Sequence, residues 1–338
     1  MQAILTITIP FFALVLCGYL AARRGLLPVD AVPGLNAYVL FFALPCMLFR
    51  FGASMPFAQL IDPVLIGAYA LCALAVVALT VALTWDRGTP VSGSTAATGV
   101  NLKNAAFGAL VASFPNTGFM GVPLLVALLG APAAGPVIGT ILVDLILTST
   151  LCIALAQVRR GTDEHRAADG SVTASVARSL RAALTNPLPW AIALGALSAA
   201  IEVDLPGPIA TMVKLLAESA TPVALFTIGA VLWRASLHSH TRTSLRHVLP
   251  VAAIKLLVHP LLVLGAGLSA RALGAPVPDF GLTVLVLAAA LPSASNVSLL
   301  TERYGADNDR VARIIMASTA LAFVSFSLLA WVMGAGIP

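Results

Sequence analysis

The sequence predicts an all-α polytopic membrane protein, with ten transmembrane helices arranged as two inverted five-helix repeats and with helices 4 and 9 broken. Three observations support this fold class. Of the 338 residues, 59% are hydrophobic and only 10% are charged, whereas about a quarter of the residues in a soluble domain are charged. The apolar residues form stretches long enough to cross a bilayer. Prolines and glycines also recur in both halves of the chain at one constant separation.

The composition excludes several other classes of protein. A globular domain of this length would expose a surface that so few charged residues could not keep in solution. The net charge of +5 is compatible with nucleic-acid binding, but the basic residues form no patch interleaved with aromatic residues, so nucleic acid is not an expected partner. The four cysteines lie in apolar stretches without a CxxC pair, which is typical of buried apolar residues. We therefore expect neither disulfides nor a metal site.

Ten apolar stretches match the roughly 20 residues that a helix needs to cross the hydrocarbon core. The first has no Lys or Arg before it, so we expect a span and not a cleaved signal peptide. Turn residues or charges separate most of the stretches. The predicted spans are about 2–21, 33–53, 61–85, 104–129, 134–157, 183–202, 207–234, 247–270, 279–301 and 310–335.

The distribution of basic residues predicts the orientation. The polar stretch 158–182 is expected to be a flexible cytoplasmic connector between a first repeat at 1–157 and a second at 183–338. With this connector inside, fifteen basic residues face the cytoplasm and two, Arg50 and Arg271, face outside. This bias follows the positive-inside rule. We expect a multi-pass protein of the inner (plasma) membrane with both termini outside. The fifteen are Arg23, Arg24, Arg87, Lys103, Arg159, Arg160, Arg166, Arg178, Arg181, Arg234, Arg242, Arg246, Arg303, Arg310 and Arg313.

An internal repeat appears when the sequence is shifted by 177 residues, which places Pro115 on Pro292. Chance matches are the alternative, because the chain has 22 prolines. Five spans per repeat is an odd number, so the second copy enters the membrane from the opposite side. Inverted repeats of this kind are common in secondary transporters. The other matched pairs are Pro10 with Pro187, Gly18 with Gly195, Pro45 with Pro222, Phe49 with Phe226, and Gly52 with Gly229.

The fourth and ninth predicted spans contain a proline followed by small polar residues, ASFPNTG at 112–118 and ALPSASN at 290–296. A proline removes a helical hydrogen bond, and the polar residues after it can satisfy or expose the freed backbone groups. The half-helix after each break directs free N–H groups toward the membrane centre, which favours an anionic group there. A simple proline kink, satisfied by Ser and Thr side chains, is the alternative.

These elements resemble the auxin efflux carrier family, whose bacterial members include carriers for malonate and related organic acids. The most specific element is NTGFMGVP at 116–123, and the sequences ALP at 43–45, KLLVHP at 255–260 and LPSA at 291–294 support it. The resemblance covers essentially the whole chain. It implies ten helices in two inverted repeats, with a scaffold from helices 1, 2, 6 and 7. It also implies a transport domain from helices 3–5 and 8–10 that moves as an elevator, and a homodimer formed through the scaffold.

The resemblance implies that the two breaks form the substrate site. The plant exporters of this family carry an asparagine directly after the second proline, where this chain has Ser293, which puts auxin itself in doubt. The expected substrate-binding residues are Asn116, Thr117, Gly118, Ser293, Ser295 and Asn296, and the crossover prolines are Pro115 and Pro292.

Ionisable residues inside predicted spans are further candidates, because intramembrane charges are costly. Lys255 and His259 share one helix face and either hold a carboxylate together or form an internal pair, with Asp144 as an alternative partner of Lys255. Asp144 is also the candidate proton carrier, since a carboxylate can gain and lose a proton during transport. Lys214 and Glu218 stand four residues apart and are expected to neutralise each other.

The expected function is secondary active or facilitative transport of a small organic anion, either a malonate-like carboxylate or an auxin-like acid. The alternative is a sodium-coupled symporter of the bile-acid type, which would need acidic residues near the breaks. No cofactor is expected. An intramembrane enzyme is disfavoured, because the chain has neither an HExxH nor a GxSxG motif.

Overall fold

The computed structural model describes residues 1–54, 62–86, 100–158, 185–237 and 244–335. Apart from Val158, the predicted connector lies outside the described residues, as do seven of the basic residues that predict the orientation. Within the described ranges the chain is helical, and the β-structure is limited to one isolated bridge between two backbone segments.

Seven helical segments are long and apolar enough to cross a membrane, judged by length and composition within the described residues. Three shorter apolar helices accompany them and fall within the predicted fourth, sixth and ninth spans: Thr117–Leu129, Pro187–Ala200 and Asp279–Ala289. The protein is therefore a multi-pass membrane protein. The seven long segments are Gln2–Arg23, Val29–Ala53, Pro63–Thr84, Ala131–Gln157, Gly207–Leu237, Leu245–Ala272 and Asn308–Val332.

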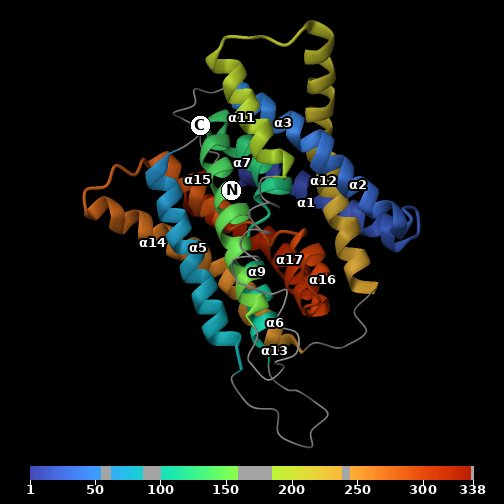
Figure 1. Ribbon diagram of the computed structural model, residues 1–338, viewed down its shortest axis with the longest axis vertical. Coiled ribbons are helices and arrows are strands. Elements are labelled where there is room, and N and C mark those ends of the chain that lie inside the picture. Colours follow the sequence, from blue (N-terminus) through green and yellow to red (C-terminus); the bar gives the residue numbers. More distant parts are fainter. Residues whose placement is uncertain (55–61, 87–99, 159–184, 238–243, 336–338) are drawn as a thin grey trace, which may run out of the picture.

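Several of these segments consist of α-helices joined by short 3₁₀ or π-helical turns. Figure 1 labels most of the α-helices. The α-helices are α1 (Gln2–Arg23), α2 (Val32–Tyr38), α3 (Leu44–Ala53), α5 (Pro63–Thr84), α6 (Leu102–Ser113), α7 (Val122–Leu129), α8 (Ala134–Val143), α9 (Ser149–Gln157), α11 (Pro187–Ala200), α12 (Gly207–Leu237), α13 (Leu245–Ala253), α14 (His259–Ala272), α15 (Asp279–Ala289), α16 (Val297–Arg303) and α17 (Asn308–Val332). The 3₁₀ turns are η1 (Val29–Ala31) and η4 (Ala131–Ala133), and the π-helical turns are η2 (Val39–Ala43), η3 (Thr117–Gly121), η5 (Asp144–Thr148) and η7 (Ile254–Val258).

Proline explains three of the four π-helical turns. Pro45, Pro123 and Pro260 each stand at the second residue of the α-helix that follows such a turn. A proline has no N–H and its ring collides with the carbonyl one turn earlier, so a wider turn relieves the collision without ending the helix. The turn η5 at Asp144 is followed by Ser149 and Thr150 instead, so proline does not explain it.

Two pairs of helices pack closely through glycines. Gly18 of α1 lies against the backbone of α12, where a Cβ atom would be 1.9 Å from the carbonyl oxygen of Phe226. Gly195 of α11 lies against α3 in the same way, and its Cβ would be 2.1 Å from the carbonyl oxygen of Phe49. Small residues allow such backbone contact between membrane helices. Both contacts are related by the offset of 177 residues found in the sequence.

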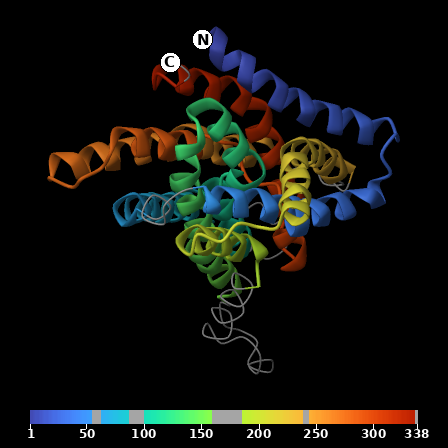
Figure 2. The ribbon, with the colours of Figure 1, turned by 90° about the horizontal axis from the view of Figure 1, so that it is seen from above.

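A second set of contacts joins the same two helix pairs. A Cβ atom at Gly229 would meet the carbonyl oxygen of Val15, and one at Gly52 would meet that of Ile192. These four residues also match at the offset of 177. In Figure 1 the α1–α12 pair lies on the right of the molecule and α5, α14 and α15 on the left. Figure 2 shows the start of α1 close to the end of α17, and these two helices are in contact.

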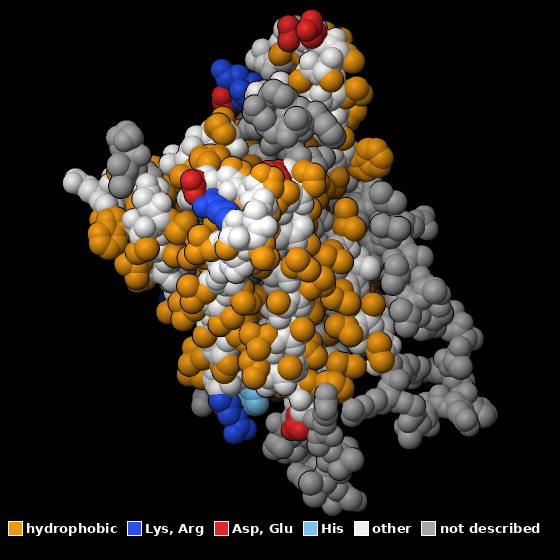
Figure 3. Space-filling model, turned by 90° about the vertical axis from the view of Figure 1, so that its left-hand side faces the viewer, with side chains coloured by type: hydrophobic (Ala, Val, Ile, Leu, Met, Phe, Trp, Pro, Cys, Tyr) orange, Lys and Arg blue, Asp and Glu red, His pale blue; other side chains and the backbone are white. Residues whose placement is uncertain are grey.

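The outer surface is apolar. Large hydrophobic side chains such as Leu71, Leu261 and Trp331 are exposed. In Figure 3, charged side chains gather toward the two ends of the visible face, and a broad band of hydrophobic side chains without charge lies between them. This arrangement fits a protein whose surface faces lipid across the middle and headgroups or water at both ends.

Two crossed helix breaks as a candidate binding site

The predicted breaks in the fourth and ninth spans are both present. Helix α6 ends at Ser113 and helical structure resumes at Thr117, while α15 ends at Ala289 and α16 begins at Val297. The other matched prolines do not interrupt a helix. Pro10 and Pro222 lie inside α1 and α12, and Pro187 is the first residue of α11.

The two breaks pair with each other. Pro115 and Ser293 form an antiparallel bridge. The N–H of Asn116 donates to the carbonyl oxygen of Pro292 over 2.8 Å, and the N–H of Ala294 donates to that of Phe114 over 3.0 Å. Backbone groups freed from helices must find partners at membrane depth, and here each break supplies them to the other.

A glycine allows this close crossing. A Cβ atom at Gly121 would lie 2.6 Å from Cδ1 of Leu291, the residue before the second proline. The carbonyl oxygen of Asn116 accepts hydrogen bonds from the N–H groups of Met120 and Gly121, which closes the first turn after the break. The sequence NTGFMG therefore starts the new helix, and its last glycine lets that helix pack closely against the second break.

Polar side chains from both breaks gather at the crossing. Asn116, Thr117, Ser293 and Ser295 are buried, whereas Gly118 and Asn296 are partly exposed. A Cβ atom at Gly118 would meet no other atom within 4 Å, so open space adjoins this residue. The structure thus brings together six of the predicted substrate-binding residues, from segments about 180 positions apart in the sequence.

Two buried polar atoms at the crossing have no hydrogen-bond partner: Oγ of Ser293 and Oδ1 of Asn296. Leaving such an atom unpaired costs about 1–3 kcal/mol, so a site of this kind favours a ligand that supplies the missing bonds. The helical segment Thr117–Leu129 also begins here, and the first N–H groups of a helix carry partial positive charge. The Ser293 hydroxyl and the N–H groups of a helix N-terminus can donate to an anion, whereas Oδ1 of Asn296 accepts a hydrogen bond from a donor group of the ligand.

Lys255 and His259 lie in a different cluster. Both are fully buried, and Nζ of Lys255 donates to the carbonyl oxygen of Ala289 over 2.6 Å and contacts Nδ1 of His259 at 3.3 Å. Ala289 is the last residue of α15, so Lys255 holds the end of the helix that leads into the second break. The Lys255 amine thereby satisfies a carbonyl group that has no partner within the helix.

Asp144 belongs to this second cluster. The hydroxyl of Tyr69 donates to Oδ2 of Asp144 over 3.0 Å, and that of Thr148 donates to Oδ1 over 3.2 Å. The rings of Tyr69 and His259 lie 5.7 Å apart. Asp144 and Lys255 interact electrostatically, but no ion pair joins them.

The remaining predicted charges are at the surface. Lys214 and Glu218 form the expected ion pair at 3.8 Å and are more than half exposed, and Arg50 is exposed. The sequence did not point to Tyr69 or Ala289. The single tyrosine of the mostly apolar span at 61–85 was the available signal for Tyr69, and nothing in the sequence signals Ala289.

The chain is similar to membrane transport proteins over nearly its whole length. A family described as "Membrane transport protein" matches residues 3–330. A Rhizobium meliloti (strain 1021) protein named "Putative malonate transporter" is 26% identical over 336 residues, which cover 99% of this chain and 98% of that protein. The uncharacterized transporter YfdV of Escherichia coli (strain K12) is 25% identical over 320 residues, 94% of this chain and 93% of its own. An uncharacterized transporter of Methanothermobacter thermautotrophicus is 27% identical, with 93% of each chain covered.

Proposed function

Since this chain belongs to the membrane transport protein family, the family of the auxin efflux carriers, we propose that it carries a small organic anion across the membrane by secondary active or facilitative transport. The substrate is a malonate-like carboxylate or an auxin-like acid. It binds where the two helix breaks cross, and the transport domain carries it past the scaffold in an elevator-like movement.

The proposal rests on buried polar atoms at the crossing that have no hydrogen-bond partner among the residues that the structure describes. Ser293 and Asn296 each have a buried oxygen atom without a hydrogen-bond partner, and the start of Thr117–Leu129 adds N–H groups. The Ser293 hydroxyl and these N–H groups can donate hydrogen bonds to a carboxylate, and Oδ1 of Asn296 can accept one from a hydroxyl or protonated carboxyl group of the substrate. The segments 109–125 and 286–300 contain no Asp or Glu. This absence favours an anionic substrate over the sodium cage of a bile-acid-type symporter.

The glycine contacts support ten helices arranged as two inverted repeats. The pairs α1–α12 and α11–α3 make equivalent contacts at equivalent residues, although their partners come from opposite halves of the chain. We assign these helices, together with α2, to the scaffold, and α5–α9 and α13–α17 to the transport domain. The termini lie outside, and a dimer forms through the scaffold.

The name of the Rhizobium meliloti relative supports a small dicarboxylate as the first substrate to test. A dicarboxylate presents two acceptor groups, and the crossing offers donors from both breaks. The serine at 293 leaves more room than the asparagine of the plant exporters would, which also favours a substrate smaller than auxin.

The proposed function is tested by uptake into proteoliposomes that contain the purified protein. Labelled malonate, malate, lactate and an indole acid are offered under imposed pH or sodium gradients. We expect uptake of at least one carboxylate without sodium, above the level of protein-free vesicles. Absence of uptake for all four acids, with protein that elutes as a folded species, would contradict the proposal. Strict dependence on sodium would replace it with the symporter alternative.

A further inference from the structure

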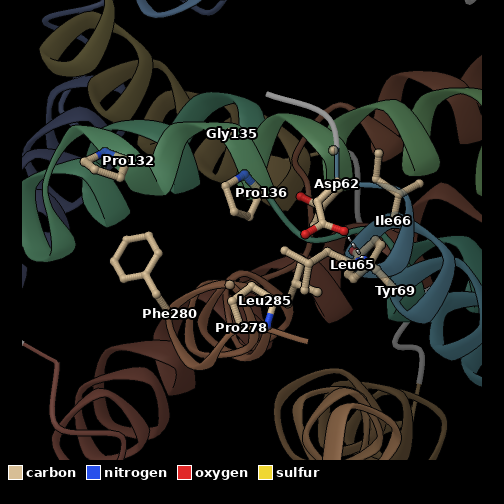
Figure 4. A pocket seen from close by; sticks show the side chains of 13 residues that line it. Asp62, Leu65, Ile66, Tyr69, Pro132, Gly135, Pro136, Pro278, Phe280 and Leu285 are labelled. Carbon is tan, nitrogen blue, oxygen red and sulfur yellow. Dashed lines mark hydrogen bonds between the residues drawn. The ribbon is translucent and has the colours of Figure 1, made fainter. Parts of the chain in front are cut away.

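A cavity of about 300 Å³ lies between the N-terminal parts of α5, α8 and α15 (Figure 4). Asp62 stands at the start of α5, where its carboxylate accepts hydrogen bonds from the N–H groups of Val64 and Leu65. Two helical turns further on, roughly 10 Å along the helix, Tyr69 forms part of the wall. The rest of the lining is mostly apolar, with Leu65, Ile66, Pro132, Pro136, Phe280 and Leu285.

Tyr69 connects this cavity to the buried acid. Its side chain lines the cavity, and its hydroxyl donates to Asp144 over 3.0 Å. Asp144 itself is fully buried. Tyr69 therefore links the wall of the cavity to a carboxylate in the middle of the fifth predicted span.

The backbone at Asp144 is also unusual. The π-helical turn η5 begins at this residue, and Oγ of Ser149 donates to its carbonyl oxygen over 2.8 Å. The other three π-helical turns each precede a proline that requires them, and this one does not. Isolated π-helical turns are frequent at functional sites, so the turn is better explained by the position it gives to the carboxylate.

The groups facing Asp144 determine what a change in its charge would do. Tyr69 of α5, Cys152 of α9 and Lys255 of η7 interact with Asp144 directly. Cys72 lies beside Tyr69, and His259 lies beside Lys255. With Asp144 ionised and Lys255 protonated, these two groups carry no net charge. Once Asp144 binds a proton, the pair carries one positive charge, and Lys255 holds the end of α15 next to the second break.

We propose that Asp144 is a proton-loading site reached through the cavity and Tyr69, and that its protonation favours anion binding at the crossed breaks. The proposal rests on the proposed function. A hydronium ion in the cavity gives a proton to the Tyr69 oxygen while the Tyr69 proton passes to Oδ2 of Asp144. The products are a water molecule, an intact tyrosine and a neutral carboxylic acid. The added positive charge balances the charge of the incoming anion, which makes the carrier a proton–anion symporter.

The proposal is tested by counting protons taken up when the substrate binds. The probe is whichever of malonate, malate, lactate and the indole acid gives the strongest uptake, added to purified protein in weakly buffered solution with a pH indicator. Wild-type protein is expected to take up close to one proton per bound anion, and its affinity to fall by up to about tenfold per pH unit wherever binding takes up that proton, as linkage requires. Asp144→Asn is expected to bind the acid without proton uptake and without this pH dependence.

Matched variants separate the site from its access route. Tyr69→Phe removes the hydroxyl that contacts Asp144 and is expected to slow uptake driven by a pH gradient by about tenfold. Tyr38→Phe removes a comparable hydroxyl, bonded to Ser219 in α12, and is expected to have no effect on that rate. Ile66→Trp fills the cavity and should slow the gradient-driven rate without changing the number of protons bound at equilibrium, whereas Leu71→Trp on the exposed face of the same helix should not.

The outcomes distinguish this inference from the proposed function. If wild-type protein binds none of the acids, the proposed function itself fails. If it binds an acid without taking up protons, or if Asp144→Asn takes up protons as the wild type does, Asp144 is not the loading site. Unchanged gradient-driven rates in both Tyr69→Phe and Ile66→Trp would exclude the cavity as the route, even if Asp144→Asn does not fold.

Discussion

Asn116→Ala is expected to weaken carboxylate binding about ten- to a hundredfold while leaving the protein folded. The backbone of Asn116 makes the hydrogen bonds that hold the crossing, and alanine keeps all of them. Within the described part of the chain its side-chain amide forms no hydrogen bond, although it is only 3% exposed. A hydrogen bond to a charged partner contributes about 1.5–3 kcal/mol, which gives the expected factor. Titration calorimetry in detergent measures it.

Asn101→Ala provides the matched control. Asn101 caps the start of α6, where its side chain accepts from the N–H of Asn104 over 2.9 Å. Loss of such a cap typically costs about 1 kcal/mol of stability, so this variant should unfold at a lower temperature and bind normally. Asn116→Ala should unfold at the temperature of the wild type and bind the carboxylate more weakly. Normal carboxylate binding by Asn116→Ala would contradict a role of the crossing in substrate recognition.

Gly18→Ala and Gly195→Ala are expected to destabilise the protein strongly and to similar extents. Each added methyl group would lie about 2 Å from a backbone oxygen of the neighbouring helix. Because that oxygen belongs to the helix backbone, relieving the collision would require the whole neighbouring helix to move. Overpacking against side chains lowers stability by about 1–3 kcal/mol. Because the methyl group here would collide with backbone atoms, we expect each variant to lose about 3 kcal/mol or more of stability. Thermal unfolding and the yield of monodisperse protein measure the effect.

Gly67→Ala is the control for both glycine variants. It makes the same substitution in α5, where a Cβ atom would meet no other atom within 4 Å. It should leave stability unchanged or raise it slightly, because alanine favours helices. Tolerance of alanine at one of the two packed positions and not at the other would contradict the structural equivalence of the two halves.

The sequence was informative wherever the signal was local. Long apolar stretches predicted the membrane segments, and a proline followed by small polar residues predicted both breaks. It was less informative about the other matched prolines. Pro45 follows a π-helical turn, Pro187 starts a helix, and Pro10 and Pro222 lie within helices that continue. Only the combination with Asn, Ser, Thr and Gly distinguishes a broken helix from a tolerated proline, because those residues satisfy or expose the freed backbone groups.

The candidate site could likewise be predicted only in part from the sequence. The polar residues of each break could be read from adjacent positions, but their pairing depends on packing between segments far apart in sequence. The same is true of the second cluster. Lys255 and His259 were identified by their spacing on one helix, whereas the contacts of Lys255 with Ala289 and of Tyr69 with Asp144 join residues 34 and 75 positions apart. Tertiary structure alone places those partners together.

Binding of a carboxylate where the two breaks cross can be tested by substrate protection of a thiol introduced by Gly118→Cys. Gly118 is partly exposed and its position has open space for a side chain. Cys17 and Cys46 are first replaced by serine, because they are accessible, whereas Cys72 and Cys152 are buried. Gly207→Cys, at the exposed start of α12, serves as the control.

The measurement is the rate of labelling by a charged thiol reagent, with and without the transported carboxylate. Saturating carboxylate is expected to slow labelling at position 118 by at least about fivefold and to leave labelling at position 207 unchanged. Equal labelling rates at position 118 with and without an acid that the same protein transports would contradict the proposed site.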